Sequence, residues 1–178
     1  MQKITTLFVR DESQRGHPVT DEVAPACLWV FIGDDRGVAT VKLDGTNVRV
    51  HDGSLYKRQK PKDRDYDVAS YVPCDRADPA DRWAFEAFDA CAPVNGIYEL
   101  IGPKIQGNPY RRCDHVLISV LPPDPSLCNI DGDLSRSFHG IREYLTCHDI
   151  EGIVFHRRDG QLAKIKRRDF GLVWPVAP

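Results

Sequence analysis

Lys42 is the residue of this sequence whose neighbours most strongly suggest covalent chemistry. It opens the string Lys-Leu-Asp-Gly-Thr-Asn over residues 42–47, at the end of an apolar, strand-like segment and directly before a turn. A lysine amine becomes a nucleophile when cations or a metal ion nearby disfavour its protonated form. By itself, however, a Lys-x-Asp-Gly string is more often a solvated hairpin than a site.

Other charged residues further along the chain also lie in apolar surroundings. Glu99 lies within Tyr-Glu-Leu-Ile-Gly, and Glu151 directly precedes Gly-Ile-Val-Phe. Lys164 and Lys166 alternate with Ile165, so both lysine side chains should project from the same face of a strand. Each of these residues alone could be an ordinary surface charge, but their order along the chain is more informative than any one of them.

Short apolar segments separated by Gly, Pro and Asp must position these residues. They predict an α+β fold with antiparallel sheets, because strand-like segments outnumber helical ones and do not alternate with them one to one. Asp78 and Pro79 offer a cap and a first-turn proline for a helix. The expected strands cover residues 28–32, 38–43, 48–50, 54–58, 96–102, 115–121, 152–155 and 161–166. The expected helices cover residues 81–88 and 138–145, with a charged loop over 59–78 and turns at 33–35, 44–45, 52–53 and 159–160.

The size and charge of the chain bound its class. It has 178 residues, with 24 basic and 26 acidic side chains and a net charge of -2. This length predicts a single domain over residues 1–178 that buries a core of its own. The charge balance gives no overall field typical of a nucleic-acid-binding protein, so any phosphate-binding surface must be local. The lack of a secretion signal and of an apolar run of ~18 residues predicts a soluble, cytoplasmic protein.

The cysteines and histidines favour structural roles over a metal site. No two cysteines have Cys-x-x-Cys spacing, whereas structural zinc sites need paired ligands at close intervals. A zinc site that uses Cys113-Asp114-His115 and Cys147-His148 is therefore the weaker alternative. His115, His139 and His156 are interpreted as strand-edge or helix-surface residues. The residues expected to be free thiols are Cys27, Cys74, Cys91, Cys113, Cys128 and Cys147.

Taken in order, the charged residues resemble the nucleotidyltransferase motifs of the covalent ligase and mRNA-capping superfamily. The resemblance begins at motif I, continues through an arginine motif and motifs III and IV, and ends at motif V. It implies a ligase/capping-type nucleotidyltransferase fold with antiparallel sheets flanked by helices. The residues that match are Lys42, Asp44, Gly45, Arg58, Glu99, Glu151, Lys164 and Lys166.

A closer similarity is to the animal 5′-to-3′ RNA ligase family, and it extends over about residues 25–176. It includes Gly-Asn-Pro-Tyr at residues 107–110 and Gly-Leu-x-Trp-Pro at residues 171–175. Because these two strings are not general ligase motifs, they favour this family over the DNA ligases. The sequence departs from the family in two respects. Lys166 occupies a position that is not always lysine there, and animal members continue beyond the Trp-Pro string.

The resemblance implies an ATP-dependent RNA ligase that forms a lysyl–AMP adduct on Lys42, transfers AMP to an RNA 5′-phosphate and seals it to a 3′-hydroxyl. ATP and Mg²⁺ are the implied cofactors, with Mn²⁺ as an alternative ion, and Glu151 is the expected metal ligand. Glu99 would accept hydrogen bonds from the ribose hydroxyls, and Arg58 would donate to ribose or phosphate. The expected nucleotide-binding set is completed by Lys42, Asp44, Gly45, Lys164 and Lys166.

Two other functions stay open on the sequence. A regulatory or RNA-end-binding protein could retain the fold without turnover, although it would have no need of a nucleophilic lysine. DNA nick sealing or capping-type guanylyl transfer is the other alternative. DNA ligases and capping enzymes carry an OB domain after motif V, and only residues 167–178 follow that motif here, so no OB domain is expected. The expected partners are ATP and RNA ends with a 5′-phosphate and a 3′-hydroxyl, and not a membrane.

Overall fold

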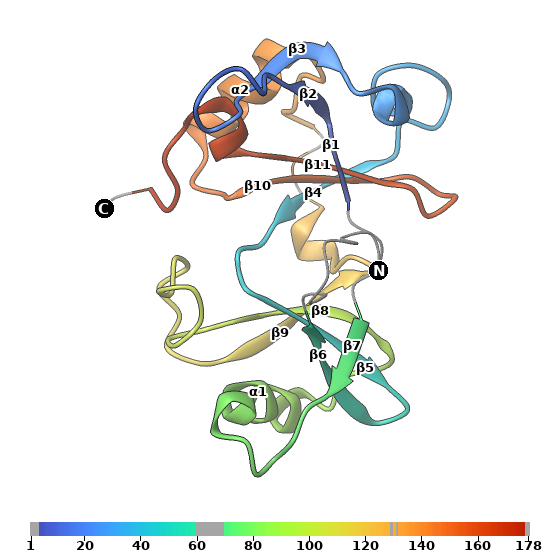
Figure 1. Ribbon diagram of the computed structural model, residues 1–178. Helices are drawn as coiled ribbons and strands as arrows, with labels where there is room; N and C mark the ends of the chain where they lie inside the picture. The colour runs from blue at the N-terminus through green and yellow to red at the C-terminus, as the bar shows by residue number, and fades with distance from the viewer. Residues whose placement is uncertain (1–3, 60–69, 129, 131, 177–178) are drawn as a thin grey trace. The chain divides into compact units, whose positions relative to one another are not determined.

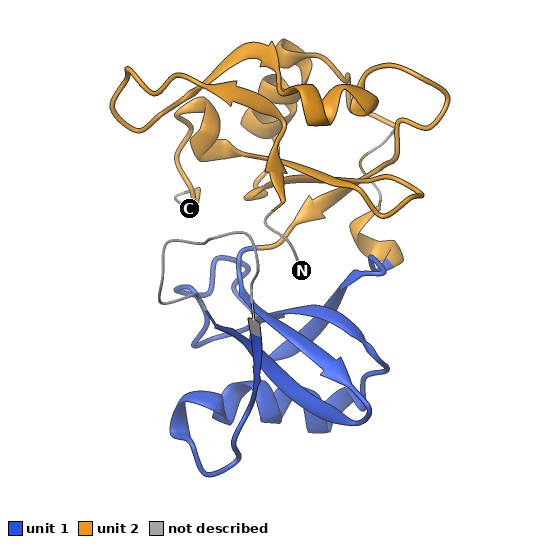
Figure 2. Cartoon of the chain, turned by 45° about the vertical axis from the view of Figure 1, so that its right-hand side comes forward, with its two compact units in different colours: residues 1–3, 44–124 blue, residues 4–43, 125–178 orange. Residues whose placement is uncertain are grey.

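The computed structural model describes residues 4–59, 70–128, 130 and 132–176, and Figure 1 shows its elements. The chain divides into two compact units (Figure 2), each of which is described by itself. Unit 1 contains residues 1–3 and 44–124, and unit 2 contains residues 4–43 and 125–178. The chain therefore enters unit 1 directly after Leu43 and returns to unit 2 after Asp124. A single nucleotidyltransferase domain over residues 1–178 stays a prediction.

Unit 2 is built on a four-stranded sheet in the order β1-β11-β10-β4. β1 (Thr5–Thr6) is parallel to β11 (Leu162–Lys166), whereas β10 (Gly152–His156) is antiparallel to both β11 and β4 (Val38–Lys42). Helix α2 (Phe138–Cys147) contributes buried residues to the same core cluster as one face of this sheet. The fully buried sheet residues on that face are Ala39, Ile153, Phe155, Ala163 and Ile165.

Unit 2 also contains a two-stranded antiparallel sheet and short 3-10 helices. The sheet consists of β2 (Phe8–Arg10) and β3 (Val19–Val23), which complete the N-terminal part that the sequence left unassigned. The 3-10 helices are η1 (Pro25–Val30), η3 (Pro125–Leu127) and η4 (Arg167–Phe170).

The strand predicted over residues 28–32 is wrong, because this segment forms the second half of η1 and the turn that follows it. Pro25 lies in the first turn of η1, where its fixed φ suits a helical start. Leu28 and Ile32 are 45% and 64% exposed, so part of this apolar run faces solvent. A short apolar run cannot be assigned to a strand by periodicity alone, and here the segment continues the 3-10 helix that begins at Pro25.

Unit 1 is built on a five-stranded antiparallel sheet in the order β7-β6-β5-β8-β9. Helix α1 (Arg82–Cys91) covers one face of the sheet (Figure 1), and Ala84 and Ala87 join the buried cluster there. The 3-10 helix η2 (Pro79–Asp81) precedes α1, and the side chain of Asp78 caps η2 by accepting a hydrogen bond from the N–H of Ala80. The strands are β5 (Thr46–His51), β6 (Ser54–Gln59), β7 (Ser70–Pro73), β8 (Gly96–Ile101) and β9 (Val116–Leu121).

The α+β class with antiparallel sheets is confirmed, with β1 as a parallel addition. Both predicted helices are confirmed, and the strands other than residues 28–32 agree within a few residues. Asp52 and Gly53 join β5 to β6 with φ values of 47° and 69°, as a two-residue hairpin turn of type I′ requires. The loop predicted over residues 59–78 contains β7, and its residues 60–69 lie outside the described residues. None of the described helices is long and apolar enough to cross a membrane.

Candidate active site

Lys42, Glu151 and Lys166 meet at one end of the four-stranded sheet of unit 2. Lys42 is the last residue of β4, Glu151 directly precedes β10, and Lys166 is the last residue of β11. The strand register places Gly152 of β10 between Lys42 and Lys166. Residues paired across a sheet project to the same face, so both lysine side chains leave the sheet on the face opposite its buried core.

The two ammonium groups bind different oxygens of the Glu151 carboxylate. Lys42 Nζ donates to Oε2 at 2.5 Å, and Lys166 Nζ donates to Oε1 at 2.5 Å. Lys42 Nζ also donates to the carbonyl oxygen of Leu43 at 3.0 Å. Glu151 is only 5% exposed, and a buried carboxylate is tolerated when partners of opposite charge satisfy its oxygens. A single buried carboxylate therefore holds the two lysine side chains next to each other.

Gly152 is required by the close approach of β10 and β11. A Cβ atom at this position would lie 2.2 Å from the carbonyl oxygen of Ile165 and 2.9 Å from Cα of Lys166. The side chain of any other residue would push these strands apart, at the position where Gly152 pairs with Lys42 and Lys166. The Glu-Gly string of the predicted motif IV therefore has a steric reason, because the carboxylate must be followed by a residue without a side chain.

Lys166 has an altered protonation equilibrium and a fixed backbone. Burial lowers the pKa of Lys166, the charge of Lys42 lowers it further, and Glu151 acts in the opposite direction. The N–H of Lys166 donates to Oδ2 of the buried Asp169 at 2.9 Å. The next N–H, that of Arg167, donates to the carbonyl oxygen of Glu151 at 2.9 Å. The site thus contains a firmly held lysine that gives up its proton more readily than an exposed lysine does.

Lys164 lies on the same face of the sheet as Lys166, one row further along β11. It pairs with Val154 of β10 and with Thr6 of β1, and the intervening Ile165 is fully buried on the other face. The predicted alternation is therefore confirmed. Lys164 adds another cation to the face that carries the Glu151 cluster.

In unit 1, groups from β8 and from the loop after it hold the turn at Asp44 and Gly45. A Cβ atom on Gly45 would lie 2.3 Å from the carbonyl oxygen of Leu100, so the turn packs closer to β8 than a side chain would permit. The N–H of Asp44 donates to the hydroxyl oxygen of Tyr110 at 2.5 Å, and the side-chain amide of Gln106 donates to the carbonyl oxygen of Gly45 at 3.3 Å. Tyr110 ends the Gly-Asn-Pro-Tyr string, which therefore contacts the Lys-x-Asp-Gly turn.

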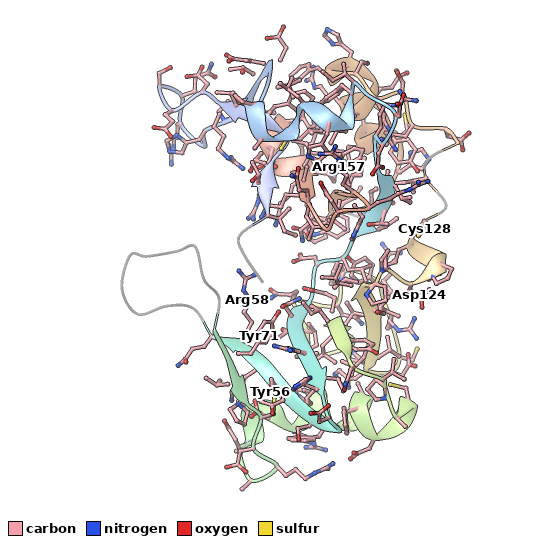
Figure 3. All side chains as sticks on the ribbon, turned by 90° about the vertical axis from the view of Figure 1, so that its right-hand side faces the viewer. Tyr56, Arg58, Tyr71, Asp124, Cys128 and Arg157 are labelled. Atoms are coloured by element: carbon pink, nitrogen blue, oxygen red, sulfur yellow. The ribbon has the colours of Figure 1, made fainter. Side chains whose placement is uncertain are left out.

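Glu99 and Arg58 lie on the face of the five-stranded sheet opposite α1. Glu99 of β8 pairs with Asn47 of β5, and Arg58 of β6 pairs with Tyr71 of β7 (Figure 3). One carboxylate oxygen of Glu99 accepts a hydrogen bond from the N–H of Gly45 at 3.2 Å. The structure thus places Glu99 against the turn that contains two other predicted residues, Asp44 and Gly45.

Several polar residues of this face were not identified from the sequence. Arg49 of β5 pairs with Tyr56 of β6, so these two side chains share the face with Arg58 and Glu99. An alternating pattern in the sequence could have identified them, because the polar residues of β5 alternate with the buried Val48 and Val50. The residues missed are Asn47, Arg49 and Tyr71 on this face, and Tyr110 in the loop after β8.

His115 has a packing role, and the structure supports no zinc site among the described residues. The His115 ring stacks on Trp83 at 4.7 Å between centroids, and its Nδ1 lies 2.9 Å from a carboxylate oxygen of Glu86. All six cysteines are free thiols, as predicted. Within residues 4–59, 70–128, 130 and 132–176, no group of three or more His, Cys, Asp and Glu side chains could hold a metal ion.

Each unit offers a distinct set of chemical groups. Unit 2 supplies the amine of Lys42 beside a carboxylate and further cations, the groups that a nucleophilic attack on a phosphate needs. Unit 1 supplies the carboxylate of Glu99 and the guanidinium of Arg58, which are suited to hydrogen bonding with sugar hydroxyls and phosphates.

Comparison with known proteins shows that the chain is similar to RNA ligases. The family model of RNA ligase 1 matches residues 90–178. RNA ligase 1 of Pongo abelii is 39% identical over 87 residues, which is 44% of this chain and 25% of that protein, and RNA ligase 1 of Danio rerio is 37% identical over 87 residues with the same coverage. RNA ligase 1 of Mus musculus is 30% identical over 175 residues, which is 93% of this chain and 46% of the mouse protein. The matched regions thus span less than half the length of each of these relatives.

Proposed function

This chain belongs to the RNA ligase 1 family, and we propose that it is an ATP-dependent RNA ligase that becomes adenylylated on Lys42. The fold would be that of the ligase/capping-type nucleotidyltransferases. The observation that carries the proposal is the cluster in which Lys42 and Lys166 both bind the buried carboxylate of Glu151. The cluster combines a lysine nucleophile, a carboxylate and a second cation, which a reaction at a nucleotide phosphate requires.

The first step would form a phosphorus–nitrogen bond. Lys42 Nζ would separate from the Glu151 carboxylate, lose a proton to solvent and attack the α-phosphorus of ATP. The bond from the α-phosphorus to the bridging oxygen breaks, and pyrophosphate leaves with the electron pair. Negative charge develops on the phosphate oxygens, and the ammonium groups of Lys164 and Lys166 would stabilise it.

The second and third steps would use an RNA end. An oxygen of the RNA 5′-phosphate attacks the phosphorus of lysyl–AMP, which returns the electron pair to Lys42 and leaves an AMP-capped RNA end. The 3′-hydroxyl of the other RNA end then attacks the RNA phosphate, loses its proton, and releases AMP. The product is a phosphodiester bond.

Glu151 is the residue that would hold Mg²⁺. Mg²⁺ is commonly bound through one or two carboxylates together with waters and substrate phosphates, so a single buried carboxylate beside a phosphate site fits it. The ion supplies charge stabilisation for the phosphates when bound. Mn²⁺, which also prefers oxygen ligands, is an alternative at the same carboxylate.

The nucleoside would be bound by residues of unit 1. Glu99 would accept hydrogen bonds from the ribose hydroxyls, and Arg58 would donate to the ribose or a phosphate. Their positions support these roles, because both lie on the sheet face opposite α1 and Glu99 contacts Gly45. Asp44 and Gly45 would orient the turn that follows the nucleophile.

The decisive experiment is incubation with ATP labelled at the α-phosphate and Mg²⁺, followed by a denaturing gel. We expect an acid-labile label on the protein that is lost in Lys42→Ala and in Lys42→Arg, the latter because a guanidinium stays protonated. Normal labelling of Lys42→Ala would refute the assignment of Lys42. A label from GTP in place of ATP would indicate capping-type chemistry.

The substrate is tested with matched nicked and looped ends at two salt concentrations. We expect sealing of 5′-phosphorylated RNA to a 3′-hydroxyl RNA end, and much slower sealing when the 3′-hydroxyl strand is all DNA, because 2′-hydroxyls distinguish RNA from DNA. Ligation should weaken as salt rises, since phosphate contacts release counterions. Equal sealing of the all-DNA strand would indicate a DNA ligase. Labelling without any ligation would indicate an end-binding or regulatory role.

A further inference from the structure

Tyr71, Asn47 and Glu99 form a chain of hydrogen bonds on the open face of the five-stranded sheet of unit 1. The hydroxyl of Tyr71 donates to Oδ1 of Asn47 at 2.6 Å. The amide Nδ2 of Asn47 donates to Oε2 of Glu99 at 3.3 Å and to the carbonyl oxygen of Tyr98 at 3.4 Å. The three side chains come from β7, β5 and β8, of which β5 and β8 are neighbours in the sheet and β7 is separated from β5 by β6.

The chemistry of the three side chains determines which group donates and which accepts in each hydrogen bond. A carboxylate only accepts hydrogen bonds, so the amide of Asn47 must turn its NH₂ group towards Glu99. Its carbonyl oxygen then faces Tyr71, whose hydroxyl must be the donor. The opposite orientation of the amide would place two acceptors against each other at Glu99. Glu99 and the carbonyl oxygen of Tyr98 thus fix which way the amide of Asn47 points, and the hydroxyl of Tyr71 holds the other end of that amide in place.

The surroundings of Tyr71 keep its hydroxyl protonated. Burial raises the pKa of Tyr71, and the negative charge of Glu99 raises it further, while Arg58 and Arg49 act in the opposite direction. A protonated hydroxyl remains a donor at every pH at which the protein would work. The hydroxyl of Tyr71 thus remains able to donate to Asn47.

The hydrogen bond from Asn47 restricts the orientation of the Glu99 carboxylate at one oxygen, and the Asp44–Gly45 turn restricts it at the other. Oε2 accepts from Asn47, and Oε1 accepts from the N–H of Gly45 at 3.2 Å. These two hydrogen bonds hold both carboxylate oxygens in fixed directions, and a carboxylate oxygen can accept more than one donor. A carboxylate that is held at both oxygens is preorganised for a ligand hydroxyl and does not have to become ordered on binding.

We propose that Tyr71 is a positioning residue that acts through Asn47 on Glu99. These linked hydrogen bonds would make the nucleotide site prefer ATP over 2′-deoxy-ATP. The inference rests on the proposed function, in which Glu99 accepts hydrogen bonds from the ribose hydroxyls. A site built to bind a hydroxyl discriminates strongly against a ligand that lacks it, provided that the polar group of the site cannot turn away. Tyr71 removes that freedom from Glu99.

The test compares Tyr71→Phe with Tyr56→Phe in the full chain. Both changes remove one hydroxyl from the same sheet face, but Tyr56 is not part of the hydrogen-bonded chain. The readout is covalent labelling by ATP and by 2′-deoxy-ATP, each labelled at the α-phosphate, over a range of concentrations. We expect Tyr71→Phe to raise KM for ATP with little change in kcat, and to reduce the preference for ATP by about 3- to 10-fold, the effect of one lost hydrogen bond. Tyr56→Phe should leave the preference unchanged.

A second pair of variants tests the route through Asn47. In an Asn47→Ala background, Tyr71→Phe should cause no further loss of preference, because the intermediate link is already absent. An unchanged preference in Tyr71→Phe, an equal loss in Tyr56→Phe, or additive losses in the double variant would each overturn the inference. If the unaltered chain takes no label from either nucleotide, the proposed function itself fails, and this outcome is distinct from the other three.

Discussion

Lys42 and Glu151 lie 109 residues apart in the sequence, yet their side chains meet at 2.5 Å. The contact exists because β10 is inserted between β4 and β11, so that the residue before β10 faces the ends of both neighbouring strands. The proposed nucleophile and its carboxylate partner are therefore placed by strand order, and not by proximity along the chain.

Glu151→Gln should abolish most of the covalent labelling by ATP while the protein stays folded. The amide has the same shape as the carboxylate but cannot neutralise two ammonium groups or bind Mg²⁺ as strongly. We expect a loss of roughly two orders of magnitude or more, because a bound ion contributes several kcal/mol of transition-state charge stabilisation, and a changed dependence of the rate on Mg²⁺. Glu143→Gln is the matched control, because Glu143 is an exposed carboxylate on α2 of the same unit. A Glu151→Gln protein that keeps both its rate and its Mg²⁺ response would disprove this role.

Lys166→Arg should move the alkaline limit of the labelling reaction to higher pH. The pKa of Lys166 is lowered by burial and by the charge of Lys42, so this lysine loses its proton at a lower pH than an exposed lysine, for which the pKa is about 10.4. Once it is neutral, Lys166 no longer stabilises charge on the phosphates, and the rate falls. Arginine stays protonated throughout this range. The check is the labelling rate against pH at saturating ATP, and an alkaline limit that does not move would show that Lys166 does not set it.

Gly45→Ala should destabilise the protein by about 1–3 kcal/mol, the usual cost of forcing extra atoms into a packed region. The added Cβ would lie 2.3 Å from the carbonyl oxygen of Leu100, where backbone would have to move. Gly132→Ala is the control, because a Cβ atom there meets nothing within 4 Å. Urea unfolding measures both free energies. Equal stabilities of the two variants would mean that the turn at Gly45 does not pack closely against β8.

Cys27 should resist alkylation far longer than Cys113 and Cys147. Burial raises the pKa of Cys27 to about 11, and its side chain is fully buried, whereas the other two cysteines are exposed. Alkylation requires the thiolate, so at about pH 8 the reaction of Cys27 is slow for both reasons. Iodoacetamide treatment of the folded protein, followed by peptide mass spectrometry, gives the rates. A Cys27 that reacts as fast as Cys113 would contradict the burial of its side chain in η1.

Local patterns in the sequence indicated the candidate site residues and correctly predicted most of the elements. Lys42, Glu151 and Lys166 could be selected because they interrupt or end apolar segments, and the alternation of Lys164 and Lys166 correctly gave the side of β11 on which they lie. These conclusions depend on local patterns, since the period of a strand fixes which side chains share a face. The segment at residues 28–32 shows the limit of the approach, because a short apolar run has no period that separates a strand from a 3-10 helix.

Which of these residues touch depends on how the strands are arranged in the folded protein. The chain from Tyr71 through Asn47 to Glu99 and the contact of Tyr110 with Asp44 join elements that the sequence gives no means of pairing. The register of a strand is set by its own alternation, but its neighbours are set by how all strands of a sheet bury their apolar faces together. Local sequence patterns thus indicated the proposed nucleophile and the charged groups, whereas the order of the strands brings Lys42 and Lys166 to one buried carboxylate.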